Sequence, residues 1–144
     1  MAHVRKQIRD AVKTLLTGLG YTPVSSLSRA LQSSEVATWV VSNASESSDV
    51  VTMDTSERTQ ARLLDLVTTA VVRAESATDD TLDAMAAALE TAWTDRTLAG
   101  VCQDRRLVSS EFDFSGEGDL EIGTAALTWQ VEYSTTENTP ETAL

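Results

Sequence analysis

Residues 105–133 read RRLVSSEFDFSGEGDLEIGTAALTWQVEY, and this stretch predicts one long β-hairpin. Side chains of a strand alternate between its two faces, so a sustained period of two indicates a half-buried sheet. In the first arm the two faces carry Val108, Phe112 and Phe114 against Glu111 and Asp113. In the second arm they carry Ala125, Leu127, Trp129, Val131 and Tyr133 against Thr124, Thr128, Gln130 and Glu132.

The hairpin is long for the size of the chain. Residues 115–119 join the arms, and their two glycines tolerate the positive φ of a tight turn. At about 3.3 Å per residue, residues 120–134 would reach about 50 Å, more than the width of a globule of 144 residues. The hairpin must therefore bend or project, and a projecting hairpin is typical of a docking device. Its candidate interface residues are Glu111, Asp113, Gly116, Glu117, Gly118 and Asp119.

Composition indicates a single domain. The chain has 144 residues, of which 42% are hydrophobic, enough for a substantial core. We expect a domain of residues 1–134 and a disordered polar tail of residues 135–144. The sequence has no apolar run of membrane-spanning length and no apolar signal-peptide segment, and its lone Cys102 cannot form an internal disulfide. Cytosolic synthesis is the simplest interpretation.

The net charge of −11 is unevenly distributed. Residues 1–13 carry four basic residues against Asp10 alone, a local charge of +3, which leaves 7 basic and 21 acidic residues, or −14, for the remainder. So acidic a surface repels phosphate and argues against tight nucleic-acid binding. The basic residues form either a solvated helix face or a contact with an acidic neighbour, including another copy of the chain. They are Arg5, Lys6, Arg9 and Lys13.

Two segments have helical periodicity. An unbroken apolar stripe predicts a helix over residues 4–19, ended by Gly18 and Gly20. A second helix is expected to start at Thr78 or Asp79 and to close near Arg96, with acidic residues in its first turn, where the helix dipole favours them.

The segment before the second helix is ambiguous. Residues 59–74 could form an apolar helical stripe, but the run from Val67 to Val72 is dense in β-branched residues, which favour strands. Read as a strand, the segment is apolar on both faces, which is typical of a central strand covered on both sides or completed by a neighbouring subunit. We predict a strand here. Shorter strands are expected at residues 36–41 and 50–53, separated by a serine-rich loop at residues 42–48.

This order of elements predicts an α+β fold. Two helices would pack on one face of a mixed or antiparallel sheet that ends in the long C-terminal hairpin.

The sequence offers little chemistry. Its only histidine, His3, lies at the N-terminus, so no Ser-His or Cys-His dyad can form inside the fold. Cys102 is more typical of packing than of a nucleophile, and the spacings of metal-binding Cys and His residues are missing. The glycines at 116 and 118 lack the helix that a phosphate-binding loop requires. We expect a protein without enzymatic activity, cofactor or metal.

Several stretches resemble the tail terminator proteins of long-tailed bacteriophages, the minor tail protein U type. The similarity covers residues 3–18 and 58–134, and its sharpest part is FDFSGEG at residues 112–118. The other similar stretches are LLDLVTTAVVRA at residues 63–74, DTLDAMA at 80–86, LAGV at 98–101 and ALTWQVEY at 126–133. Residues 20–57 match less well.

The resemblance implies a structural virion protein with an α+β fold. Such proteins assemble as a hexameric ring on the last ring of tail-tube subunits, stop tube polymerisation and present a joining surface to the head connector. DNA would pass through the ring without specific binding, no membrane would be involved, and the protein would act at the head-proximal end of the tail after assembly in the host cytoplasm. The basic helix and the acidic remainder are one possible pair of ring contacts. Two alternatives stay open: a neck or head-closure protein of the same virion, and a small acidic adaptor or inhibitor.

Overall fold

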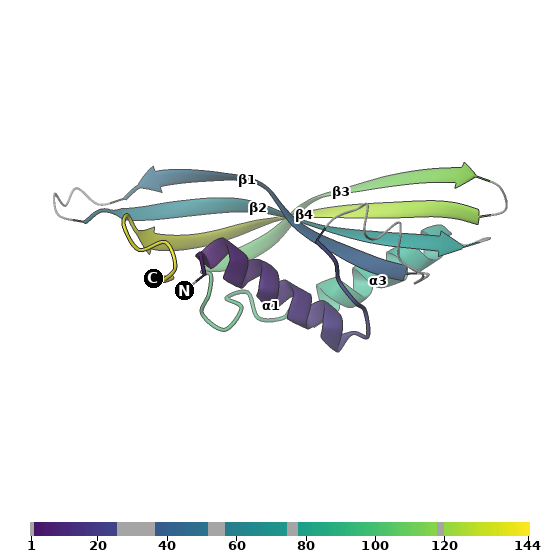
Figure 1. The fold of residues 1–144 in the computed structure, drawn as a ribbon, viewed down its shortest axis with the longest axis horizontal. Coiled ribbons are helices and arrows are strands. Elements are labelled where there is room, and N and C mark those ends of the chain that lie inside the picture. The colour runs from purple at the N-terminus through teal and green to yellow at the C-terminus, as the bar shows by residue number, and fades with distance from the viewer. Residues whose placement is uncertain (1, 26–36, 52–56, 75–77, 118–119) are drawn as a thin grey trace.

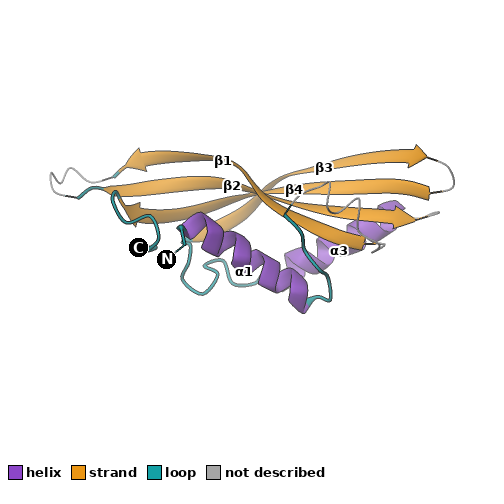
Figure 2. Cartoon of the chain, in the orientation of Figure 1, coloured by secondary structure: helices purple, strands orange, loops and turns teal. Residues whose placement is uncertain are grey.

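The computed structural model describes residues 2–25, 37–51, 57–74, 78–117 and 120–144. It is an α+β fold in which two helices lie on one face of a four-stranded antiparallel sheet (Figures 1 and 2). The elements follow the order α1 (Val4–Gly18), β1 (Ala37–Val50), β2 (Thr59–Ala74), α3 (Thr78–Ala92), β3 (Asp104–Glu117) and β4 (Leu120–Thr136). The sheet order is β1-β2-β4-β3. The predicted fold class and the C-terminal hairpin are confirmed.

β2 is a central strand, as its two apolar faces predict. It pairs with β1 on one side and with β4 on the other. Leu64, Leu66 and Ala70 point from β2 into the core, whereas Leu63 and Val67 face the opposite side and are partly exposed. In the described part of the chain, no helix covers this second side of the sheet, which we call the open face.

The core forms between the sheet and both helices. The α1 stripe of Val4, Ile8, Val12 and Leu16 is fully buried, and it belongs to the same cluster as the buried side chains of α3 and of the sheet. Trp129 lies at the centre, as its position on the apolar face of β4 predicts. Its ring lies 4.7 Å from that of Trp93, and its Nε1 donates a hydrogen bond of 3.1 Å to Thr68 Oγ1.

The hairpin neither bends back nor projects alone. β2 accompanies β4 along its whole length, from Thr59 opposite Thr136 to Ala74 opposite Glu121. The sheet as a whole is therefore long and twisted, and the connected ends of the two hairpins lie at opposite ends of it (Figure 1). Because β4 is an interior strand of the sheet, β3 is the strand of this hairpin that lies at the edge of the sheet.

The prediction for residues 36–53 is wrong in its main part. Instead of two short strands around a loop, β1 runs without a break through Val50, and residues 42–48 lie within it. β2 supplies the reason, because its length lets it pair with β1 as far as Val50 opposite Gln60, with one irregularity between Asn43 and Ser45. These ladder hydrogen bonds outweigh the turn preference of serine. Residues 36, 52 and 53 lie outside the described residues.

The second helix ends earlier than predicted, at Ala92 rather than near Arg96. Asp95 organises the loop that follows, because its carboxylate accepts hydrogen bonds from the backbone N–H groups of Thr97 and Ala99 at 3.0 and 2.8 Å. A hydrogen bond from the Thr97 hydroxyl, together with these two backbone bonds, holds the pKa of Asp95 below its usual value. The segment therefore turns back toward β3 instead of continuing the helix.

The C-terminal residues have a defined course, contrary to the predicted disordered tail. Residues 135 and 136 belong to β4, and the remainder turns back against the start of α1. Val4 N donates to Pro140 O at 3.0 Å, Gln7 Nε2 to Glu141 O at 2.8 Å, and Leu144 N to Ser134 O at 2.9 Å. The tail thus supplies acceptors for groups at the N-terminal end of α1.

Candidate interaction surfaces

The basic residues of α1 are largely engaged within the chain. Arg5 forms an ion pair with Glu46 at 3.3 Å, and Lys6 forms one with Asp10 at 2.6 Å. Lys13 Nζ donates to the Ser25 hydroxyl at 2.9 Å. Arg9 is partly buried, and its Nε has no hydrogen-bond partner among the described residues. These side chains are therefore less available to a neighbour than the charge count suggests.

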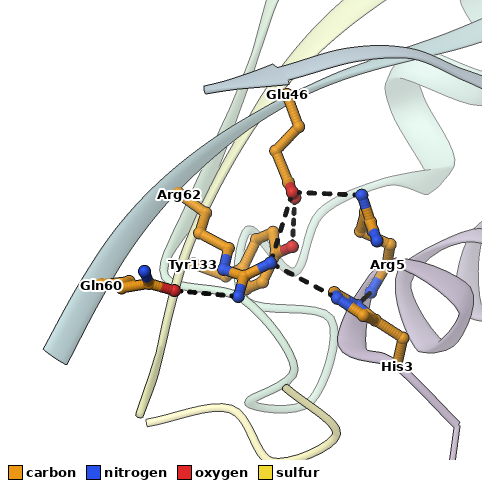
Figure 3. A network of polar contacts seen from close by, with 6 residues as sticks. All are labelled: His3, Arg5, Glu46, Gln60, Arg62 and Tyr133. Atoms are coloured by element: carbon orange, nitrogen blue, oxygen red, sulfur yellow. Dashed lines mark hydrogen bonds and ion pairs between the residues drawn. The ribbon is translucent and has the colours of Figure 1, made fainter. Parts of the chain in front are cut away.

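Arg5 belongs to a polar network that joins the N-terminus to the sheet (Figure 3). Its centre is Glu46 of β1, whose carboxylate accepts from Arg5 Nη1 at 3.3 Å, from Arg62 Nη1 at 3.4 Å and from the Tyr133 hydroxyl. The side chains of Glu46 and Arg62 are only 10% and 12% exposed. Gln60 extends the network by accepting from Arg62 Nη2 at 3.1 Å. Three strands and the start of α1 are thus tied together at this end of the sheet.

Burial determines the ionisation of two groups in this network. It raises the pKa of Tyr133, and the hydrogen bond to Glu46 raises it further, so the hydroxyl remains a proton donor. Burial also lowers the pKa of His3 below its usual 6.5, as do the nearby charges of Arg5 and Arg62. The neutral ring can then accept the Arg5 N–H through Nδ1 at 3.2 Å and cap α1. The network is suited to fixing the helix on the sheet.

Sequence reasoning missed this network. Glu46 falls in the segment expected to be a loop, and only the β1–β2 register brings it near Arg62, with Glu46 opposite Leu64. The alternating apolar pattern of β4 indicated that Tyr133 faces the core, but it did not identify its partner.

The acidic candidates lie on the other edge of the sheet. Glu111 and Asp113 are exposed on the open face of β3, opposite Ala126 and Thr124 of β4. They do not meet the basic residues of α1 in their own chain, because α1 packs against β1 and α3. Gly116 and Glu117 are the last residues of β3, and Gly118 and Asp119 lie outside the described residues.

Two aromatic residues alternate with these carboxylates. Phe112 and Phe114 point to the helix side of β3, yet they remain 51% and 46% exposed. Phe114 lies close to Gly123, where a Cβ atom would meet Leu82 Cδ1 at 3.0 Å and Phe114 Cδ1 at 3.3 Å. Glycine at this position therefore gives Phe114 room beside Leu82. Phe112 is the more exposed of the two rings, near the end of an edge strand.

Each edge strand has one covered half and one free half, where the cover is backbone pairing at the edge of β1 and side-chain packing on one face of β3. On β1, Val24 pairs with Val40 through hydrogen bonds to Trp39 O at 2.8 Å and from Val41 N at 3.1 Å. Among the described residues, no further backbone bond reaches the outer edge of β1 beyond Val41.

On β3, the guanidinium of Arg105 lies over the rings of Trp93 and Trp129, each at 5.3 Å, and Leu107 packs against the core. Residues 108–115 that follow are exposed. Five of the seven exposed large apolar residues in the described part of the chain lie at or beside these free halves, with Val50 and Val51 at one and Val108, Phe112 and Phe114 at the other.

The described residues include no group of three or more His, Cys, Asp or Glu side chains placed to hold a metal ion. Cys102 is buried, and burial raises the pKa of its thiol to about 12. Within the same described ranges, no helix combines the length and apolar character needed to cross a membrane. Comparison with known proteins adds no relative, because no family model and no curated protein matches the sequence.

Proposed function

We propose that this protein is a structural virion protein that caps the phage tail tube. In this proposal a hexameric ring of the protein ends tube polymerisation and forms the joining surface for the head connector. The resemblance to tail terminators and the α+β fold that this resemblance implied both support the proposal.

One observation carries the proposal. The sharpest part of the resemblance, residues 112–118, begins on an edge strand instead of in the core, because residues 112–117 belong to β3 and the side chains of residues 112–115 are exposed. A core motif would be explained by packing alone, but exposed aromatic residues are typical of a surface that binds another protein. The described side chains of the segment that most resembles a tail terminator, those of residues 112–115, are thus exposed at an edge of the sheet.

The charge of the protein is compatible with a channel for DNA. Asp65 of β2 and Glu132 of β4 lie on the open face together with Glu111 and Asp113 of β3. Carboxylates on one face repel phosphate and would let a duplex pass without binding. The net charge of −11 acts in the same direction.

The test uses the tail tube protein encoded with this chain. The wild-type protein should shorten tubes that polymerise in its presence, as measured by negative-stain electron microscopy. Phe112→Ser should keep the melting temperature of the wild type and lose the effect on tube length. Leu144→Ser is the matched control, because Leu144 is 58% exposed but is held beside Ser134, at the other end of β4 from the partner of Phe112, and it should behave as wild type.

Two outcomes would contradict the proposal. Wild-type protein that leaves tube length unchanged would exclude a capping role. Protein that binds the purified head connector but not the tubes would favour a neck protein in place of a terminator.

A further inference from the structure

The free halves of the two edge strands lie at opposite ends of the sheet. On β1 the free half is residues 43–50, which lead to the β1–β2 connection. On β3 it is residues 109–117, which lead to the β3–β4 turn at the other end (Figure 1). An edge strand offers a row of unpaired backbone N–H and C=O groups to any strand that can lie beside it.

We propose that the free half of β3 pairs with the free half of β1 from a second copy of this chain. The proposal deepens, and rests on, the proposed ring, because it identifies the contact between its subunits. A contact between two different patches joins copies head to tail, and such contacts can close into a ring.

The strand directions fit this pairing. All neighbouring strands in the sheet are antiparallel, so β1 runs opposite to β2, and β3 runs opposite to β1. Two copies in the same orientation therefore place β1 of one antiparallel to β3 of the next, and the sheet continues without reversing either subunit. The open faces of both copies then lie on the same side.

The side chains of the two strands also complement each other. On the open face, β3 presents Ser109, Glu111 and Asp113, and β1 presents Ser45, Ser47 and Asp49. The antiparallel register with Glu111 opposite Ser47 also places Asp113 opposite Ser45 and Ser109 opposite Asp49. Glu111 then faces the Ser47 hydroxyl, and Asp49 faces the Ser109 hydroxyl. Asp113 faces Ser45, whose hydroxyl donates to Asp65 Oδ2 at 2.9 Å within its own chain, so no carboxylate lies directly opposite another.

The same charges disfavour pairing of β3 with its own copy. An antiparallel pair of two β3 strands centred on residue 111, 112 or 113 places Glu111 opposite Glu111, Glu111 opposite Asp113, or Asp113 opposite Asp113. Like charges directly opposite each other destabilise a strand pair. The serine-rich half of β1 is therefore the better partner for the acidic half of β3.

Cysteine pairing on the isolated protein tests this contact. Variants Glu111→Cys and Ser47→Cys are prepared separately, one of them with a size tag, then mixed at high concentration and oxidised. The native Cys102 can stay in place, because it is only 5% exposed and its thiol pKa is raised to about 12. Ser45→Cys is tested in the same way, so that a register shifted by two residues is also detected.

We expect a disulfide-linked dimer of Glu111→Cys with Ser47→Cys or Ser45→Cys, several-fold more abundant than any dimer formed by one variant alone. The control is Glu111→Cys mixed with Glu90→Cys, in which the second cysteine replaces another exposed acidic residue, on α3. A double variant with cysteines at 47 and 111 should give a ladder of covalent multimers.

Two results would overturn the inference. One is a dimer of Glu111→Cys alone that matches the mixture, because this would assign the contact to two β3 strands. The other is cross-linking of both serine variants at the level of the Glu90→Cys control. The assay contains no tubes, so failure of this contact is distinguishable from failure of the capping function. If the cross-link forms but the wild-type protein does not limit tube length, the contact is retained and the capping function is rejected.

Discussion

Removal of the Glu46 carboxylate should strongly destabilise the fold. In Glu46→Ala, Arg62 loses its anionic partner while its side chain is only 12% exposed. The Tyr133 hydroxyl, on a residue that is 1% exposed, loses its acceptor as well. Breaking a buried ion pair from one side typically costs about 3–5 kcal/mol. Arg5 adds little to this cost, because it is 41% exposed and can turn to water.

The assay is chemical or thermal unfolding followed by circular dichroism. With a cost of about 3–5 kcal/mol, the melting temperature of a domain of this size should fall by roughly 10–15 °C. Glu46→Gln should lie between the wild type and Glu46→Ala, because the amide retains an acceptor for the Tyr133 hydroxyl but no charge for Arg62. The double variant Glu46→Leu/Arg62→Leu should recover much of the loss, since it leaves no unpaired charge.

Asp10→Ala provides the matched control. Asp10 is also a carboxylate in an ion pair, with Lys6, but both side chains are more than half exposed. Its removal should change the free energy of unfolding by less than about 1 kcal/mol. The reasoning is refuted if Glu46→Ala also costs less than about 1 kcal/mol, or if the two variants are equally destabilised.

Three further predictions concern the core, the N-terminus and the edges. Trp129→Ala should cost about 3–5 kcal/mol, the range for loss of a large buried aromatic, and an unfolding midpoint close to that of the wild type would contradict its central place in the core. The pKa of His3 is lower in the fold than its usual 6.5, so the unfolded chain binds the proton more readily. The contribution of His3 to the free energy of unfolding should therefore be complete above pH 6.5 and decline as the pH falls through 6.5 toward the lowered value. His3→Gln should lack this part of the pH dependence, and parallel pH profiles of the wild type and the variant would refute the prediction. In the isolated chain at low concentration, backbone amides of residues 43–50 and 109–115 should exchange hydrogen faster than those of β2 and β4, as measured by mass spectrometry. Equal protection of these amides would contradict the assignment of residues 43–50 and 109–115 as free edges.

The sequence predicted the centre of the sheet better than its margins. Apolar residues on both faces of residues 59–74 identified a central strand, and the period of two in β4 identified Trp129 as a core residue. These signals are local, because burial favours apolar residues along the whole length of a central strand, and the pattern can be read from that strand alone. They needed no knowledge of the neighbouring strand.

The outer half of β1 could not be recognised from its own residues. Its serines, asparagine and acids favour a loop, and its strand conformation comes from pairing with β2. The Glu46–Arg62 pair follows from the same register and was therefore missed with it. The defined tail has a similar explanation, since residues 137–144 owe their course to hydrogen bonds with the start of α1, with Arg58 and with the end of β4.

The central position of the β2–β4 pair also has a consequence for how the chain folds. Each hairpin joins strands that are neighbours in sequence, but β2 meets β4 only after the chain has passed through α3 and β3. The hairpins can therefore form early and independently, whereas their docking must close a long loop and is expected to limit the rate of folding. Until they dock, β2 and β4 each carry an unpaired apolar edge, so newly made chains are most prone to aggregate at this stage.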